Sequence, residues 1–369
     1  MVSLFTRRRL ILNSPAALLA VDAEAAERNP FAAVAGRPDS VAAFTESGEV
    51  PLKREGSTWQ GENGVQVGTD AGITVRCPRS ALLRIRLRWQ LTPAAALRYT
   101  GDHWERSYGD LAWRYMEPER ILPWYFLATD GKATHACGVK TAPAALCFWQ
   151  VDPSGVSLWL DVRNGGRGVQ LGKRELAVAI VVTETYNGMS SFDAAGLFCK
   201  RLCAKPRLPH APVYGGNNWY YAYGKSSAED IRRDSERIAA LAPGLANKPF
   251  MVIDDGWEPN HVAGPWSRGN AGFPDMPQLA QDMRRIGVQP GIWMRPLFVK
   301  DDAAKAWRLQ SPNAAREYAK GQISTLDPTI PEVQARVQQD IRTLAGWGYS
   351  LIKHDFSTYD LLGRWGFNM

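Results

Sequence analysis

Hydrophobic residues in the first half of the chain recur with a period of two, which is typical of β-strands. In residues 83–91 (LRIRLRWQL), Ile85, Leu87 and Trp89 alternate with arginines. One face of this strand should therefore be buried and the other exposed to solvent. Residues 156–162 and 176–185 have similar strand character, with turn residues between them. Short strands without a helical period predict a β-sandwich over residues 31–205, closed by a helix over 191–203.

The pattern changes after residue 213, where strands begin to alternate with helices. Three prolines in "AKPRLPHAP" predict a linker over residues 206–213. Predicted strands over 216–224, 249–253, 291–296 and 349–354 follow, and charged residues gather where these strands end. This alternation predicts a (β/α) barrel over residues 214–369.

The predicted barrel is incomplete. A complete (β/α)8 TIM barrel has eight strands in about 250 residues, whereas four strands are predicted here. We therefore expect a multidomain β and α/β protein, with a β-sandwich followed by the first half of a barrel, and we interpret the chain as a fragment.

The predicted helices of this second part are marked at their ends. Ser227 with Asp230, and Thr329 with Glu332, have the spacing of a capping box. Gly287 follows an amphipathic segment and is expected to end its helix. These positions set the expected helix boundaries.

Candidate chemistry lies at the predicted strand ends. Lys353 and Asp355 are two residues apart on one strand, so their side chains should point the same way. Asp254 and Asp255 follow another buried strand. The structural alternative is an ion pair and a turn cap. The carboxyl ends of the parallel strands in a barrel, however, meet at one end of the barrel, where active sites lie. Neighbouring buried carboxylates also need hydrogen-bond donors, and sugar hydroxyls can supply them. Both arguments favour an active site.

Aromatic residues extend this candidate site. Most of the 14 tryptophans should pack in cores, but flat indole faces also suit the C–H faces of sugars. Three tryptophans and one arginine lie in or just after the predicted barrel strands, and we treat them as candidate sugar-binding residues: Trp219, Trp257, Trp293 and Arg295.

The strand-end motifs carry a family resemblance. "VIDDGWE", "GIWMRP" and "LIKHDF" resemble successive motifs of the α-galactosidase clan, especially glycoside hydrolase family 36 (GH36). In that family a DDGW turn, a GxW strand and a KxD strand follow an N-terminal β-sandwich in this order. Each motif alone is weak, whereas their order and strand placement together are specific.

The resemblance implies a retaining glycosidase acting on α-galactosides. Asp355 would be the nucleophile, and Lys353 would bind a sugar hydroxyl and keep Asp355 ionised. Asp254 and Asp255 would bind the 4- and 6-hydroxyls. The family's proton donor is an aspartate on a later strand that has no match in this sequence, so we expect the fragment to be inactive.

The chain departs from the family pattern, and several functions stay open. Arg295 stands where members often have glutamate, and His354 replaces the usual aromatic residue. The alternatives are an α-N-acetylgalactosaminidase, a galactosyl transferase of the same clan, or a carbohydrate-binding relative that has lost catalysis. The expected partner is an α-galactoside oligosaccharide or glycoconjugate, and formation of a homo-oligomer is left open.

Composition excludes several other classes. With 369 residues, 45% hydrophobic and 22% charged, the chain is typical of a globular protein with room for two cores. The net charge of +7 is spread along the chain, which argues against nucleic-acid binding. Five cysteines without a CxxC pair and five histidines without HExxH predict no disulfide framework, no metal site and no cofactor.

Residues 1–30 have the layout of an export signal. A TRRR segment (6–9), a short apolar stretch and an AEA segment (23–25) resemble a twin-arginine signal, which predicts a periplasmic or secreted protein. The alternative is a disordered basic leader on a cytoplasmic protein. The apolar stretch is broken at residues 13–15, so it is too short to span a membrane.

Overall fold

The computed structural model of the protein describes residues 29–103, 111–163, 167–300, 302–309, 324–357 and 360. The chain divides into two compact units, one formed by Met1–Val162 and Val169–Pro206, the other by Arg163–Gly168 and Arg207–Met369. Residues 1–28 of the predicted leader lie outside the described residues. The predicted leader and domain boundaries therefore stay predictions.

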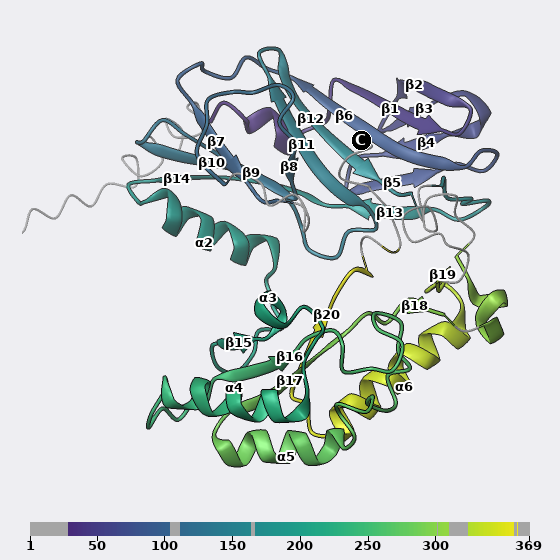
Figure 1. Ribbon diagram of the computed structural model, residues 1–369. Coiled ribbons are helices and arrows are strands. Elements are labelled where there is room, and N and C mark those ends of the chain that lie inside the picture. Colours follow the sequence, from purple (N-terminus) through teal and green to yellow (C-terminus); the bar gives the residue numbers. More distant parts are fainter. Residues whose placement is uncertain are drawn as a thin grey trace, which may run out of the picture. The chain divides into compact units, whose positions relative to one another are not determined.

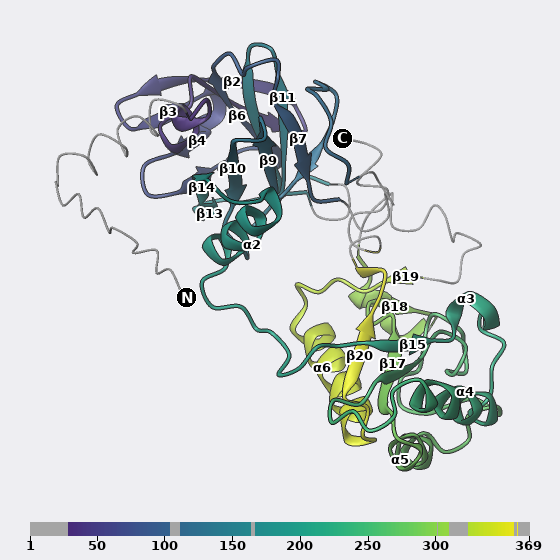
Figure 2. The ribbon, with the colours of Figure 1, turned by 90° about the vertical axis from the view of Figure 1, so that its left-hand side faces the viewer.

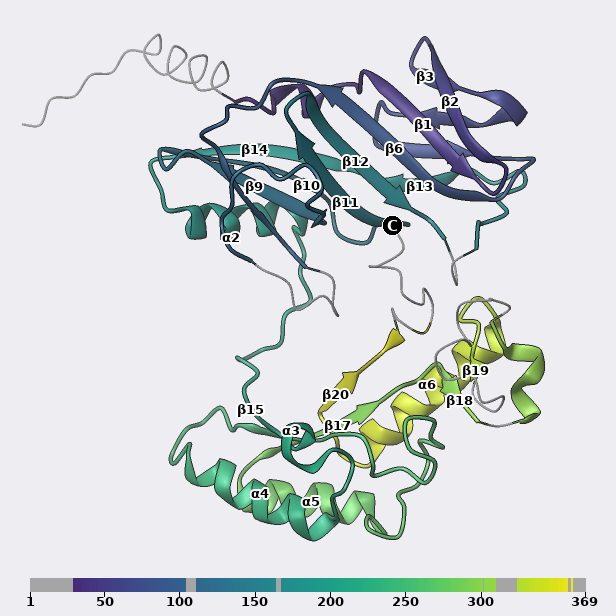
Figure 3. The same cartoon turned by 45° about the horizontal axis from the view of Figure 1, so that its top comes forward.

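The first unit is a β-sandwich-like domain of two antiparallel sheets, as the sequence predicts (Figure 1). Figure 3 shows β1, β6 and β12 in one layer and β9, β10 and β14 in the other. The larger sheet has the order β13 (Leu176–Ala179), β5 (Ile73–Arg76), β4 (Gln66–Gly68), β3 (Thr58–Gln60), β2 (Gly48–Glu55), β1 (Ser40–Thr45), β6 (Leu82–Gln90), β12 (Gly155–Asp161), β11 (Leu146–Asp152), β8 (Leu122–Pro123). The smaller sheet has the order β14 (Val181–Asn187), β10 (Ala133–Val139), β9 (Tyr125–Thr129), β7 (Arg98–Gly101).

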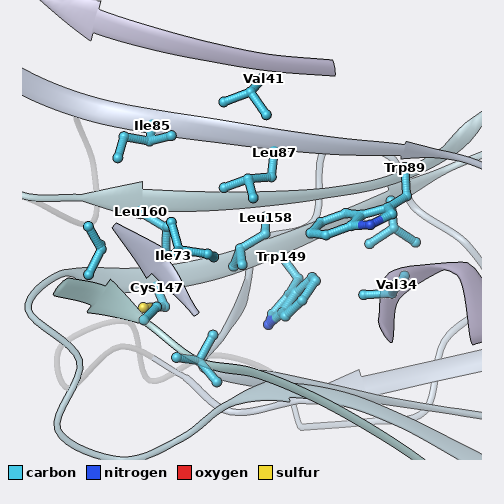
Figure 4. Close-up of a cluster of buried hydrophobic side chains, with 14 of the residues drawn as sticks. Val34, Val41, Ile73, Ile85, Leu87, Trp89, Cys147, Trp149, Leu158 and Leu160 are labelled. Carbon is cyan, nitrogen blue, oxygen red and sulfur yellow. The ribbon is translucent and has the colours of Figure 1, made fainter. Parts of the chain in front are cut away.

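The sandwich core lies between the two sheets. Ile85, Leu87 and Trp89 of β6 are at most 2% exposed, so the predicted alternation of this strand is confirmed. Figure 4 shows these side chains with Trp149 of β11 and Leu158 of β12 in one cluster. Two 3-10 helices, η1 (Ala32–Ala35) and η2 (Glu62–Gly64), belong to the same unit.

Helix α2 (Ser191–Leu202) closes the first unit over the predicted segment. Its residues Phe198 and Leu202 pack against Leu127 and Ala136 of the smaller sheet. The helix begins where the Ser190 side chain accepts a hydrogen bond from the Asp193 backbone N–H, which satisfies one of the open donors of the first turn.

Two predicted strands are corrected by the structure. Residues 176–185 form two strands, because the chain passes from the larger sheet to the smaller one at Ile180. The aromatic strand predicted over 216–224 ends at Asn217. There the Asn217 side-chain oxygen accepts a hydrogen bond from the Trp219 backbone N–H at 2.8 Å, and a short helix follows.

The second unit contains a parallel sheet in the order β15–β16–β17–β20, the order of the strands along the chain. A two-stranded antiparallel sheet, β18–β19, follows β17. Its elements are β15 (Gly215–Asn217), α3 (Trp219–Ala222), α4 (Ala228–Ala240), β16 (Phe250–Ile253), α5 (Met276–Ile286), β17 (Gln289–Met294), β18 (Phe298–Val299), η3 (Asp302–Trp307), β19 (Ser324–Thr325), α6 (Pro331–Gly346) and β20 (Leu351–His354).

Helices α4 and α5 lie on the same side of this parallel sheet (Figures 1 and 2). Ile253 of β16 and Ile292 of β17 are fully buried in the core that the helices share with the sheet. Because side chains alternate along a strand, Asp254, Trp293 and Lys353 fall on the face away from the helices. The packing of α4 and α5 against one face of the sheet therefore leaves the polar side chains on the opposite face.

The predicted helix ends are only partly confirmed. The Ser227 hydroxyl accepts a hydrogen bond from the Asp230 backbone N–H at the start of α4, and Gly287 ends α5 with φ 114°. The capping box predicted for α6 is wrong. Its N-cap is Ile330, and the Thr329 hydroxyl instead donates to the Asp327 side chain at 2.7 Å. No helix in the described ranges is long and apolar enough to cross a membrane.

Candidate active site

Asp254 is a buried carboxylate at the carboxyl end of β16. Its side chain is 3% exposed, and its Oδ2 accepts hydrogen bonds from Asn217 Nδ2 at 2.6 Å and from Lys353 Nζ at 2.7 Å. Its Oδ1 accepts from the Asp255 backbone N–H at 2.9 Å. The backbone N–H of Asp254 donates to Asn218 Oδ1 at 2.7 Å. A buried charge needs such partners, and β15, β16 and β20 together supply them.

Asp355 lies at the end of β20 with both carboxylate oxygens hydrogen-bonded. Its Oδ2 accepts from Trp293 Nε1 at 2.8 Å and lies 3.4 Å from Lys353 Nζ. Its Oδ1 accepts from the Phe356 backbone N–H at 2.9 Å. The side chain is 21% exposed, so this carboxylate is oriented from two sides and still open to solvent.

Lys353 bridges the two carboxylates. Burial by itself lowers the pKa of this amine, but the hydrogen bonds and negative charges of Asp254 and Asp355 outweigh that effect and raise the pKa above its ordinary value. The lysine is therefore cationic at neutral pH. The structure brings together four residues that were candidates from the sequence: Asp254, Trp293, Lys353 and Asp355. It adds Asn217, which donates a hydrogen bond to Asp254. Asn217 was not a candidate from the sequence because it lies in the segment predicted to be an aromatic strand.

Asp255 belongs to the turn after β16 and contacts different groups from Asp254. Its Oδ1 accepts from the Val262 backbone N–H at 3.1 Å. The next residue, Gly256, has φ 104°, and a Cβ there would overlap the Gly224 carbonyl oxygen. The glycine of the DDGW motif therefore lets the loop after α3 pack directly on this turn.

Glu258 is a buried carboxyl group that the sequence pattern does not reveal. It is 1% exposed, and its Oε2 accepts from the Gly256 backbone N–H at 3.2 Å. Within the described residues, Oε1 has no hydrogen-bond donor. Burial, and secondly the carboxyl group of Asp255, raise the pKa of Glu258 to about 9. Glu258 therefore keeps its proton at neutral pH. The sequence does not predict this, because the pKa shift depends on the burial of Glu258 in the turn.

Replacing Glu258 with glutamine should change how stability depends on pH. The folded-state pKa of Glu258 is raised, so its contribution is fully present below about pH 4.5 and is lost as the pH rises toward about 9. Glutamine does not titrate. The free energy of unfolding of Glu258→Gln relative to wild type should therefore increase by up to about 4 kcal/mol between pH 5 and pH 8, measured by denaturant titration.

The matched control for this experiment is Glu236→Gln, which changes an exposed carboxyl group on α4. Its unfolding free energy should follow the wild-type curve across the same pH range. If the Glu258→Gln curve also runs parallel to the wild-type curve, Glu258 does not hold a proton in the folded protein.

The predicted sugar contacts of two tryptophans turn out differently. Trp257 is fully buried, and its Nε1 donates to the Trp293 backbone carbonyl at 3.0 Å. Trp293 is only 1% exposed, so neither indole face is accessible in the described residues and the predicted sugar contacts of both rings are corrected. Trp257 instead supports the Trp293 backbone, and Trp293 reaches the site through the N–H that it donates to Asp355. Trp219 is half-buried beside Tyr223, with ring centroids 5.6 Å apart, and its role stays a prediction.

Arg295 is also corrected, because it does not point into an open mouth. It is 1% exposed and forms hydrogen bonds from Nε to both carboxylate oxygens of Asp360, at 2.9 and 3.1 Å. Its guanidinium carbon lies 3.7 Å from the ring centroid of Phe298 and 4.4 Å from that of Phe356. An arginine packed in this way has no accessible surface for a sugar.

The described part of the chain contains no group of three or more histidine, cysteine, aspartate or glutamate side chains that could hold a metal ion.

Comparison with known proteins shows likeness in structure. No protein-family model matches the chain, and no curated protein sequence matches it. Among solved structures, the chain is similar to the α-galactosidase TtGalA from Thermus thermophilus in complex with p-nitrophenyl α-D-galactopyranoside. The TM-score is 0.52 at 19% identity, over 86% of this chain and 64% of that one.

Two further solved structures give the same result. One is a variant of the GH36 α-galactosidase AgaA from Geobacillus stearothermophilus in complex with raffinose, with a TM-score of 0.52 at 16% identity, over 87% of this chain and 55% of that one. The other is the α-galactosidase from Lactobacillus brevis, with a TM-score of 0.51 at 16% identity, over 85% and 52%.

These comparisons confirm the predicted likeness to GH36 α-galactosidases at the level of the fold. The chain spans about two thirds or less of the length of these three structures.

Proposed function

We propose that the protein is a retaining glycosidase that acts on α-galactosides, with Asp355 as the nucleophile. The observation that carries this proposal is the Lys353 ammonium group, which lies 2.7 Å from Asp254 Oδ2 and 3.4 Å from Asp355 Oδ2 at neighbouring strand ends. Both carboxylates accept hydrogen bonds at each oxygen, but Asp254 is 3% exposed whereas Asp355 is 21% exposed. Such a pair suits different roles, one in binding and one in reaction.

The parallel sheet is proposed to be the first half of a (β/α)8 barrel. Its four strands follow chain order, α4 and α5 cover one face, and the polar cluster lies at the carboxyl ends. In the described residues β15 pairs only with β16, and β20 only with β17. A closed barrel would pair both edges with further strands, on which we place the proton donor, about 5–5.5 Å from Asp355.

The proposed reaction proceeds in two displacement steps. An Asp355 oxygen attacks the anomeric carbon, the bond to the leaving oxygen breaks, and that oxygen takes a proton from the donor carboxyl group. Water then attacks the anomeric carbon of the glycosyl ester, gives its proton to the same group, and releases Asp355. The Lys353 ammonium group lies 3.4 Å from Asp355 Oδ2, and the Trp293 and Phe356 N–H groups orient the carboxylate.

Recognition of galactose is proposed for Asp254 and Asp255. Their side chains bond different groups, so each can accept a hydrogen bond from a different sugar hydroxyl. The likeness to the TtGalA structure with stachyose and to the AgaA variant with raffinose supports an oligosaccharide ligand for this chain. We assign Asp254 and Asp255 to the 4- and 6-hydroxyls.

The decisive experiment uses the protein expressed from its complete gene. It should hydrolyse p-nitrophenyl α-galactoside and release galactose with retained α configuration, followed by NMR. A 2-deoxy-2-fluoro galactosyl reagent with a good leaving group should label the peptide that contains Asp355, identified by mass spectrometry. Galactose binding without hydrolysis would instead indicate a carbohydrate-binding protein, and the absence of both would reject a galactoside function.

A further inference from the structure

Arg295 forms a buried clamp with three residues near Asp355. We use "arginine clamp" for Arg295, Phe298, Phe356 and Asp360. The Arg295 and Asp360 side chains are 1% and 2% exposed, and two of their hydrogen bonds measure 2.9 and 3.1 Å. The guanidinium group also packs over both phenyl rings. The clamp thus links the end of β17 to two described residues beyond β20, Phe356 and Asp360.

Phe356 directly follows Asp355 in the chain. Phe356 adopts φ 63°, a left-handed conformation that a bulky side chain rarely occupies and that surrounding packing must hold in place. The Asp360 backbone N–H donates to the Phe356 carbonyl oxygen at 2.7 Å, so Asp360 is tied to Phe356 through the backbone as well. The clamp therefore grips the strained residue by its ring and through Asp360.

The residue that the clamp holds also contacts Asp355. The Phe356 backbone N–H donates to Asp355 Oδ1 at 2.9 Å, whereas Trp293 Nε1 donates to the other oxygen, Oδ2. If Phe356 shifts when the clamp is removed, Oδ1 loses its described donor and the carboxylate can rotate. Arg295 thus acts on the orientation of Asp355 through Phe356, whose ring it packs against.

We propose that Arg295 is a positioning residue that fixes the Asp355 carboxylate through Phe356 and Asp360. The inference rests on the proposed function only where it concerns reactivity, because the geometry of Asp355 can be observed separately. This positioning role also explains why the Arg295 guanidinium group is buried at the end of β17, where a sugar could not contact it.

The test replaces both members of the buried ion pair. Arg295→Met alone would leave Asp360 buried without its partner, which strongly destabilises proteins. The double variant Arg295→Met/Asp360→Leu keeps apolar volume, and such replacements are often neutral for stability. The matched control is Arg232→Met/Asp282→Leu, which removes an ion pair of 2.9 Å between α4 and α5.

In the protein expressed from its complete gene, the clamp variant should be labelled at Asp355 by the 2-fluoro reagent at least about thirtyfold more slowly than wild type. Its dissociation constant for galactose should stay within about threefold, because the binding carboxylates are untouched. The control variant should match wild type in both measurements. Labelling of the clamp variant within about threefold of wild type would overturn the proposal.

Crystal structures keep the inference testable whatever the activity. If wild type is not labelled at Asp355, the proposed function fails, and the clamp is judged by geometry alone. The clamp variant should then show Phe356 outside the left-handed region and its N–H bond to Asp355 lost. Retention of both features in the clamp variant would refute the positioning role. If the clamp variant does not fold, Asp360→Asn replaces it. This substitution should weaken the ion pair between Arg295 and Asp360, and it should also slow the labelling of Asp355.

Discussion

Replacing Asp355 with asparagine should reduce turnover of p-nitrophenyl α-galactoside at least about a thousandfold in the protein expressed from its complete gene. Asparagine is nearly isosteric, but its amide cannot form the glycosyl ester. It also presents an NH₂ group to a site where Trp293 Nε1 and Phe356 N–H both donate. Steady-state kinetics gives the turnover, and titration calorimetry should show galactose binding largely kept.

The control for this experiment is Asp282→Asn, which changes a carboxylate on α5 that bonds Arg232. Its turnover should equal that of wild type within about twofold. If Asp355→Asn retains activity within about tenfold of wild type, the nucleophile is a different residue and the proposed mechanism is wrong.

The second large effect concerns the choice of sugar. The enzyme should prefer aryl α-galactosides over aryl α-glucosides by at least about thirtyfold in kcat/KM. A glucoside turns its 4-hydroxyl equatorial, which removes the sugar donor from one of the two carboxylates. Losing a hydrogen bond to a charged group in a desolvated pocket costs on the order of 2–4 kcal/mol, or roughly thirtyfold to a thousandfold in rate. Parallel kinetics on the two p-nitrophenyl glycosides measures the ratio.

Alanine variants locate the source of this preference. Asp254→Ala and Asp255→Ala should each reduce the ratio, chiefly by losing activity on the galactoside. Asp254→Ala should have the larger effect, because it also removes the hydrogen-bonded partner of Lys353. Equal kcat/KM on the two glycosides with the wild-type protein would reject galactose as the recognised sugar, even if Asp355 proved to be the nucleophile.

Much of the candidate site could be predicted because strand geometry is local. A period of two places Lys353 and Asp355 on one side of their strand. In the structure the Lys353 ammonium group lies between the carboxylates of Asp254 and Asp355 and pairs with both. Hydrophobic runs flanked by turn residues likewise indicated β6, β16 and β17. Only backbone geometry and side-chain polarity are needed for such predictions.

Boundaries set by more distant partners were predicted less well. The break at Ile180 depends on the chain changing sheets, and the end of β15 depends on an asparagine that serves both the turn at Trp219 and the carboxylate of Asp254. Neither partner is visible in a local pattern. In each case a tertiary contact overrides the local propensity for a strand.

By itself the sequence determined the β-sandwich, the order of the parallel strands, and the residue types at their carboxyl ends. Only the tertiary structure decided which of these residues face open space. Arg295 resembled a sugar ligand until Asp360, 65 residues further along the chain, was found to pair with it in the core. Glu258 gave no signal at all, because its raised pKa comes from burial and from the Asp255 carboxyl group. Polarity is a property of a residue, whereas burial and charge pairing arise only when distant segments meet.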